Sequence, residues 1–217
     1  MLNFVVHWVA EPLLEGKGHG IGIERMLGMF RKSAPPGRFL FLTDQNTPSV
    51  DGWETLRTER SDLNVMGHMM ASRVAACRVL EGNTLFADAD TLVNMDKDLS
   101  ELFKGEWSMR VRWYPRFLCG TMLCKDSSFA GRFFQEAYDR ILDCSPLHKL
   151  FGADLAMMKE IIIEDGAGFQ KDTSDLICTT APNNPAEAKK WLPISYLVDF
   201  KGARKKYMET ILENMTC

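Results

Sequence analysis

Phe86-Ala87-Asp88-Ala89-Asp90-Thr91-Leu92-Val93 is the stretch of sequence that says most about the fold. The apolar run Leu85-Phe86-Ala87 is typical of a buried strand, and two carboxylates separated by one residue follow it directly. In an α/β protein such a loop lies at the carboxyl edge of the sheet, where ligands bind. Two neighbouring carboxylates are costly to bury without a cation, and hard oxygen ligands suit Mn²⁺ or Mg²⁺ beside a phosphate. The stretch therefore predicts a metal site at Asp88 and Asp90, with a solvated acidic turn as the alternative.

Strands and helices alternate along the chain on both sides of this stretch. Residues 3–9 and 38–44 are short apolar runs, and helical patterns cover residues 23–32 and 62–80. This alternation predicts the α/β class, with a mixed, mostly parallel central sheet flanked by helices. Further helices are expected at about residues 129–142 and 152–163, and a basic helix at 203–214.

The composition excludes several other classes of protein. The 217 residues are 46% apolar and carry a net charge of −3, which is typical of a globular chain without strong overall attraction to nucleic acid. The expectation is one domain over residues 1–217, with a nucleotide-binding half at about 1–95 and an acceptor half at about 96–217. Since no run of 18 apolar residues and no secretory signal is found, we expect no membrane span, a cytoplasmic protein and reduced thiols at the six cysteines.

From Leu85 to Phe103 the chain resembles the metal-dependent GT-A glycosyltransferases, above all glycogenin and the bacterial lipooligosaccharide galactosyltransferases. The resemblance implies the GT-A fold and an Asp-x-Asp pair, Asp88 and Asp90, that holds a manganese ion against the diphosphate of a nucleotide sugar. It also implies that Arg73, one helix earlier, contacts the donor phosphate or sugar, while Gly152-Ala153-Asp154 faces the sugar. Asp154 and Arg73 are accordingly the candidates for catalytic residues, although Asp154 could instead cap its helix.

A second motif, Val198-Asp199-Phe200-Lys201-Gly202-Ala203-Arg204-Lys205, resembles the closing His-Phe-x-Gly-x-x-Lys motif of this family. The resemblance implies that Asp199 is the third metal ligand and that Gly202 and Lys205 grip the diphosphate. Asp199 stands where the family has His, and a carboxylate can still bind Mn²⁺ or Mg²⁺. Two other departures are Leu155 in place of a Gln, and Phe117-Leu118-Cys119-Gly120 in place of Phe-Asn-Ser-Gly.

The nucleoside of the donor has candidate contacts at the ends of the first two strands. His7 and Trp8 could stack on the base, with core packing as the alternative, and Asp44 closes the second strand in a similar position. The resemblance therefore implies a glycosyltransferase that uses Mn²⁺ (or Mg²⁺) and a nucleotide-diphosphate sugar, with retention at the anomeric carbon. A UDP-sugar is favoured over a GDP-sugar as the donor. The acceptor is left open as a glycan, a protein, a small molecule or a modified nucleic acid.

Two other functions compete with this interpretation. Phosphatases of the haloacid-dehalogenase type also have Asp-x-Asp after an apolar strand, and Asp88 would then be the nucleophile and Asp90 the acid and base. That chemistry requires the pair on the central strand of a fully parallel sheet. A non-catalytic, transferase-like binding protein is the other alternative.

Overall fold

The computed structural model describes residues 1–10, 21–60, 64–113, 117–144, 152–174, 176–181, 183–184 and 194–216. Its strands are β1 (Asn3–His7), β2 (Arg38–Thr43), β3 (Glu54–Arg57), β4 (Thr84–Ala87), β5 (Thr91–Val93), β6 (Met109–Arg112), β7 (Leu118–Cys124), β8 (Phe169–Asp172), β9 (Cys178–Thr180) and β10 (Leu197–Asp199). Its helices are α2 (Ile23–Ser33), α3 (Val65–Cys77), α4 (Ser127–Asp143), α5 (Ala153–Glu164) and α7 (Met208–Thr216), with 3₁₀ helices η1 (Leu99–Phe103) and η4 (Gly202–Tyr207).

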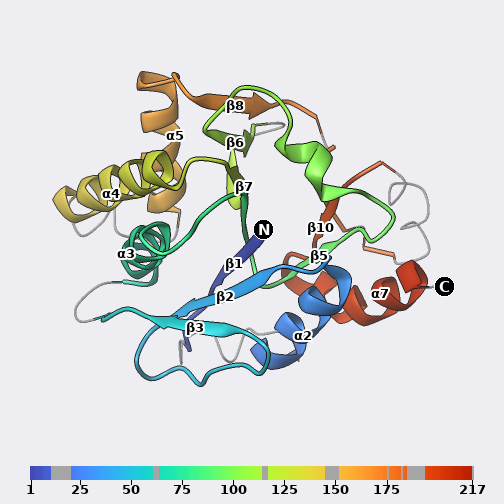
Figure 1. Ribbon diagram of the computed structural model, residues 1–217. Helices are drawn as coiled ribbons and strands as arrows, with labels where there is room; N and C mark the ends of the chain where they lie inside the picture. Colours follow the sequence, from blue (N-terminus) through green and yellow to red (C-terminus); the bar gives the residue numbers. More distant parts are fainter. Residues whose placement is uncertain are drawn as a thin grey trace.

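The central sheet confirms the predicted fold class. In the described part of the chain it has seven strands in the order β3-β2-β1-β4-β7-β6-β8 (Figure 1). Only β7 runs against its neighbours β4 and β6, and the remaining pairs are parallel. Because parallel strands share one direction, the residues that follow β1, β2 and β4 emerge at the same edge of the sheet.

Helices cover both faces of this sheet. Successive side chains of a strand point to opposite faces, so Phe4 and Val6 pack in one apolar cluster while Val5 packs in another. The first cluster includes residues of α2 and α7, and the second includes residues of α3, α4 and α5. Figure 1 shows these two groups of helices on opposite sides of the strands. Burial on both faces explains why β1 and β4 are continuous apolar runs and lack the alternation of a half-exposed strand.

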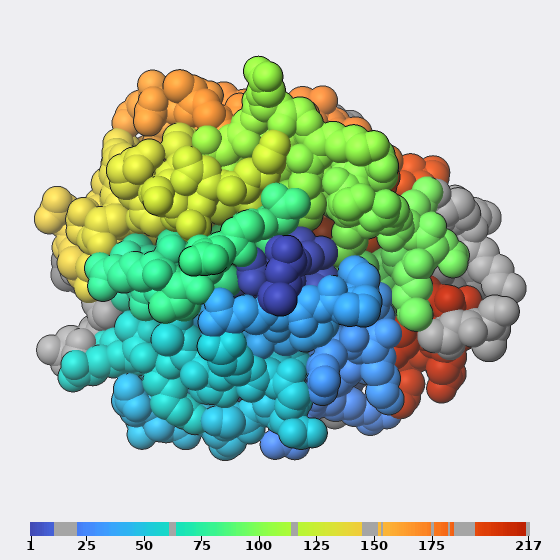
Figure 2. All heavy atoms as spheres, viewed as in Figure 1, coloured from blue at the N-terminus to red at the C-terminus, as the bar shows by residue number. Residues whose placement is uncertain are grey.

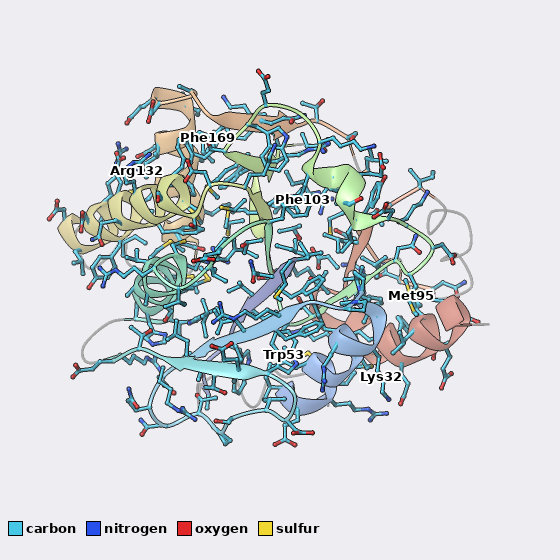
Figure 3. The ribbon with its side chains drawn as sticks, in the orientation of Figure 1. Lys32, Trp53, Met95, Phe103, Arg132 and Phe169 are labelled. Atoms are coloured by element: carbon cyan, nitrogen blue, oxygen red, sulfur yellow. The ribbon has the colours of Figure 1, made fainter. Side chains whose placement is uncertain are left out.

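Aromatic side chains join the helices to the sheet edges on both sides. Trp53 packs edge-on against Phe30 of α2, with ring centroids 5.7 Å apart. On the other side, Phe169 of β8 lies near α4 (Figure 3), and its ring centroid is 5.0 Å from that of Phe129 and 5.1 Å from that of Phe133. These contacts anchor α2 and α4, the helices with the most clearly amphipathic sequences.

A second, smaller sheet brings together two segments that lie far apart in the sequence. Its strand order is β5-β10-β9, with β10 antiparallel to β5 and parallel to β9. The register places Asp199 opposite Thr91, the residue that follows the Asp88–Asp90 pair. The chain expected to form a basic helix at 203–214 begins as the 3₁₀ helix η4 and becomes α-helical only at Met208. This sheet therefore sets where the second motif meets the first.

The chain's N-terminus lies at the opposite end of β1 from these motifs. Met1 is 92% exposed, and the N-terminal residues stand in the middle of the face drawn in Figure 2.

None of the helices in the described residues has the length and apolar content needed to cross a membrane. The five cysteines within the described ranges, Cys77, Cys119, Cys124, Cys144 and Cys178, are unpaired, as expected for reduced thiols.

One buried hydroxyl links α2 to the small sheet. Ser33 Oγ donates to the carbonyl of Phe30 (2.8 Å) and accepts from the amide of Val93 in β5 (2.9 Å). We expect Ser33→Ala to lower the free energy of unfolding by about 1–3 kcal/mol, because the buried amide of Val93 loses its partner. Urea denaturation measures this change. Ser128→Ala, at an exposed position of α4, is the control and should stay within about 0.5 kcal/mol of the parent; equal losses in the two variants would contradict the link.

Candidate active site

Backbone hydrogen bonds fix both ends of the Asp88–Asp90 loop. The amide of Asp88 donates to the carbonyl of Gly120 on β7 at 2.9 Å. Two residues later, the carbonyl of Asp90 accepts from the amide of Phe200 at 2.8 Å. The first bond holds the loop to the central sheet, and the second holds it to the segment after β10. Asp88 and Asp90 therefore lie beside Asp199, as the two motifs predicted.

Gly120 is required for the position of the Asp88 carboxylate. A Cβ atom at residue 120 would overlap Asp88 Oδ2 and stand 3.0 Å from Asp88 Cγ. The carboxylate therefore lies directly against the backbone of β7, in space that any larger residue would fill. In the sequence this glycine ends the segment Phe117-Leu118-Cys119-Gly120, and no local pattern there indicates its contact with Asp88.

One ammonium group stands among the three predicted carboxylates. Lys201 Nζ forms an ion pair with Asp88 Oδ2 and lies 3.4 Å from Asp90 Oδ1 and 3.6 Å from Asp199 Oδ1. Lys205 Nζ lies 3.2 Å from the other oxygen of Asp90. We call Asp88, Asp90 and Asp199 the carboxylate cluster. In the part of the chain that the structure describes, no three His, Cys, Asp or Glu side chains form a ready-made metal centre.

Burial shapes the electrostatics of this cluster. The side chains of Asp90 and Asp199 are only 8% and 9% exposed. Burial raises the pKa of Asp199 to about 6; the charges of Asp90 and Asp88 act in the same direction, whereas Lys201 opposes them. Burial alone would lower the pKa of Lys201, but the three carboxylates outweigh it and raise that pKa. Lys201 is therefore a firmly protonated cation.

A cavity of about 550 Å³ opens beside the cluster. Its charged lining residues come from α3, the loop after β4, β6, α5 and the segment around β10: Arg73, Asp88, Arg112, Asp154, Asp199, Lys201 and Arg204. When Asp90 and Lys205 are counted with these residues, the site has five basic and four acidic side chains. The site is thus slightly basic overall and suits an anionic group as large as a diphosphate.

Arg73 lies in the wall of this cavity, as its predicted role requires. The side chain is buried, and its guanidinium carbon is 5.8 Å from the centre of the Phe86 ring and 5.4 Å from that of Phe134. Its buried Nη1 forms no hydrogen bond within the described residues. An unsatisfied buried donor is costly, so a ligand oxygen that reached this nitrogen from the cavity would gain a strong partner.

Asp154 also lines the cavity, and its surroundings differ from those of a helix cap. Helix α5 is capped by Gly152, whose φ of +98° suits glycine, and Asp154 lies in the first turn, where the helix dipole favours a carboxylate. Cys119 Sγ donates to Asp154 Oδ2 at 3.4 Å. Burial, aided by the charge of Asp154, raises the pKa of the Cys119 thiol and keeps it protonated as a donor.

The residues predicted to contact the nucleoside do not line the cavity. His7 Nε2 lies 2.9 Å from His68 Nδ1, and His68 Nε2 lies 3.0 Å from the Thr58 carbonyl. Since a carbonyl only accepts, His68 carries its proton on Nε2, and His7 Nε2 donates to His68 Nδ1. Burial and nearby positive charge lower the pKa of His7, which is consistent with a neutral pair. Trp8 packs against the apolar core.

Asp44 and Gly202 are likewise not among the residues that line the cavity. Asp44 is buried, and its Oδ1 accepts from the amide and the hydroxyl of Thr47 at 2.8 and 2.6 Å, which forms the turn after β2. Gly202 has φ of +59° and opens η4, the turn that carries Lys205 to Asp90. Contacts of His7, Trp8, Asp44 and Gly202 with a donor stay predictions.

Arg112 was not singled out from the sequence, whereas Arg204 belongs to the basic cluster of the second motif. Arg112 is 4% exposed on β6, and Arg204 donates from Nε to Asn183 Oδ1 at 3.0 Å. The alternation Met109-Arg110-Val111-Arg112 could have placed two arginines on one face of a strand. No local signal could have placed that face in the wall of the cavity, because β6 reaches it through the order of the strands.

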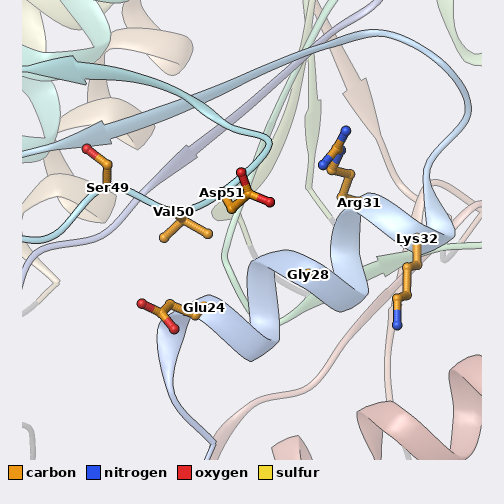
Figure 4. Close-up of a pocket in the computed structure, with 7 residues that line it drawn as sticks. All are labelled: Glu24, Gly28, Arg31, Lys32, Ser49, Val50 and Asp51. Atoms are coloured by element: carbon orange, nitrogen blue, oxygen red, sulfur yellow. The ribbon is translucent and has the colours of Figure 1, made fainter.

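A second hollow, beside α2, is separate from this site. It measures about 640 Å³ and is lined by Glu24, Gly28, Arg31, Lys32, Ser49, Val50 and Asp51 (Figure 4). Its acidic and basic groups are spread along the helix, with Glu24 near one end and Lys32 near the other. None of the residues singled out from the sequence lies in it, so the candidate active site is the cavity beside the carboxylate cluster.

Three solved structures similar to this chain are glycosyltransferases. A glycosyltransferase involved in the glycosylation of the major capsid of PBCV-1 aligns with a TM-score of 0.58 at 10% identity, over 100% of this chain and 99% of its own. Two structures of the glycosyltransferase GlyE from Streptococcus pneumoniae TIGR4 align with TM-scores of 0.58 and 0.59 at 12% identity. This chain spans only 62% and 60% of those GlyE chains.

The fold is therefore that of glycosyltransferases, as the first motif implied. At such low identity the likeness defines the fold, and the nearer resemblance to glycogenin and the lipooligosaccharide galactosyltransferases stays a prediction. No described sequence family and no curated protein matches the chain. The phosphatase alternative required a fully parallel sheet around the Asp pair, and the antiparallel pairing of β4 with β7 does not meet that requirement.

The close contact between Gly120 and Asp88 can be tested by adding one methyl group. We expect Gly120→Ala to lower the free energy of unfolding by about 1–3 kcal/mol, because Asp88 must rotate away. Gly28→Ala is the matched control: open space surrounds this helical glycine, so alanine should stabilise by about 0.5–1 kcal/mol. In an Asp88→Ala background Gly120→Ala should cost much less. An undiminished cost there would contradict the proposed contact.

Proposed function

We propose that the protein is a glycosyltransferase that transfers a sugar from a nucleotide-diphosphate donor to an acceptor. The donor that we favour is a UDP-sugar. The observation that carries this proposal is the meeting of the two motifs at one cavity, on a glycosyltransferase fold. The resemblance of the motifs favours retention at the anomeric carbon. Residues 1–95 would then form the nucleotide-binding half, with Asp199, Lys201 and Lys205 reaching its diphosphate site from the acceptor half at residues 96–217.

The basic side chains of the site would bind the donor diphosphate. Lys205 and Lys201 approach the cluster from η4 and its N-terminal end, and Arg73 of α3 and Arg112 of β6 line the same cavity. A diphosphate bound between these side chains would replace protein carboxylates as the partner of several lysine and arginine groups. As the glycosidic bond to the donor breaks, negative charge grows on the diphosphate, and pre-positioned cations stabilise that charge.

The carboxylate cluster would hold a divalent cation, Mn²⁺ or Mg²⁺, through Asp88, Asp90 and Asp199. Two observations support the fit: the ligands are hard oxygens, and Asp199 Oδ1 is buried without a hydrogen bond among the described residues. When bound, the ion would neutralise charge on the leaving diphosphate.

Asp154 would act on the sugar side of the cavity. Its carboxylate lies in the wall at the start of α5, and the Cys119 thiol holds one of its oxygens. From there it can accept a hydrogen bond from a sugar or acceptor hydroxyl and so orient the group at the anomeric carbon. Arg73, on the neighbouring helix α3, would contact the donor phosphate or the sugar.

Donor binding can be tested by thermal denaturation with UDP-sugars and GDP-sugars, with and without Mn²⁺. We expect one donor with Mn²⁺ to raise Tm by about 5–10 °C near saturation, because it binds only the folded state. Asp90→Ala should remove the Mn²⁺-dependent part of this rise. The control Asp96→Ala, at an exposed position in the turn after β5, should keep it. An unchanged shift in Asp90→Ala would refute the cation assignment.

Turnover separates an enzyme from a non-catalytic binding protein. We expect the donor found by thermal denaturation to release its nucleoside diphosphate slowly to water, and Arg73→Gln to lower that rate about a hundredfold or more through the loss of a pre-oriented donor to the diphosphate. Arg132→Gln, an exposed arginine of α4 marked in Figure 3, is the control and should leave the rate unchanged. Tight donor binding without any release or transfer would favour the binding protein.

A further inference from the structure

Lys201 meets more carboxylates than Lys205, the other lysine beside the cluster. Its ammonium lies within ion-pair distance of Asp88, Asp90 and Asp199 together, whereas among the described residues Lys205 pairs with Asp90. It occupies the region between the three side chains that would hold a divalent cation. A second cation cannot share those oxygens with the ammonium at close range, because the two positive charges would repel each other.

The position of Lys201 in the chain allows its ammonium to move away from the carboxylate cluster. Asp199 and its neighbours in β10 are buried, but Lys201 follows the strand as the residue before η4, and its side chain is 45% exposed. Its long flexible stem can therefore rotate toward the cavity, whose wall it already forms, without disturbing the β5–β10 pairing. The three aspartates, by contrast, are held by short side chains next to paired backbone.

We propose that Lys201 is a built-in counter-ion that fills the carboxylate cluster in the ligand-free protein, and that a divalent cation enters only by displacing it. The displaced ammonium then meets the diphosphate of the donor, a step that rests on the proposed function. Metal and nucleotide consequently favour each other: the nucleotide offers the displaced ammonium a new partner, and the metal frees the ammonium for the nucleotide. In this chain Lys201 couples the binding of the two.

Binding of Mn²⁺ alone, without any nucleotide, tests the displacement directly. Electron paramagnetic resonance of free Mn²⁺ gives the affinity of the parent protein and of three lysine-to-methionine variants. We expect Lys201→Met to bind Mn²⁺ about tenfold more tightly or better than the parent, since no ammonium has to leave. Lys206→Met removes an exposed charge of η4 that contacts the ring of Tyr207, and it should match the parent.

Lys205→Met separates competition from a general effect of charge. Lys205 also stands next to Asp90, so a general field effect predicts equal gains in affinity for Lys205→Met and Lys201→Met. Competition predicts a clearly larger gain for Lys201→Met. Equal gains, or no gain in Lys201→Met, would overturn the proposal. If none of the proteins binds Mn²⁺ at millimolar concentration, this inference and the cation assignment both fail, while donor binding in the thermal assay decides separately whether the transferase function stands.

Stability gives a second measurement that does not depend on affinity. Removing the ammonium leaves three carboxylates close together, so Lys201→Met should have a lower Tm than the parent in the presence of a chelator. Mn²⁺ should restore that Tm, while the parent should gain little from Mn²⁺ without nucleotide. The proposal would be wrong if Mn²⁺ stabilises both proteins equally. The proposal would also be wrong under a second combination of results: the parent has the same affinity for UDP with and without Mn²⁺, and Mn²⁺ does not restore the Tm of Lys201→Met. In that case the ammonium of Lys201 would take the place of the ion permanently.

Discussion

The antiparallel pairing of β5 with β10 is the constraint on which the site depends. It joins the segment after the central strand β4 to the segment before η4, two parts of the chain more than a hundred residues apart. Through this pairing Asp199 lies opposite Thr91, and Phe200 bonds to the backbone of Asp90. Without it, the two motifs would be separate acidic and basic stretches, and neither could form the wall of a cavity.

Charge balance is the second constraint, because the pairing forces like charges together. Three carboxylates meet at the end of β10, two of them almost completely buried, and burial raises the pKa of Asp199. Lys201, the residue before η4, and Lys205, within η4, compensate from the short segment that follows β10. The same segment thus introduces the last carboxylate and the basic side chains that make its burial possible.

Much of the fold could be predicted because its central strands are buried on both faces. Short apolar runs at β1, β2 and β4, separated by helical patterns, are sufficient to predict an α/β sheet with ligands at its carboxyl edge. The short strands β3, β5 and β9 carry no comparable signal, since three or four residues show no clear period. They exist because neighbouring strands offer them a hydrogen-bonding edge, and only the folded chain provides that edge.

The sequence by itself determined the residue types and local spacing of the site: Asp88 and Asp90 after an apolar strand, and Asp199, Gly202 and Lys205 in one motif. Tertiary structure alone decided which other groups surround them. Gly120 matters because β7 passes against Asp88, and Arg112 enters the cavity because β6 follows β7 in the sheet. The physical reason is range: spacing along the chain fixes neighbours within a turn or a strand, whereas contacts between strands depend on pairings that form only when the whole sheet is assembled.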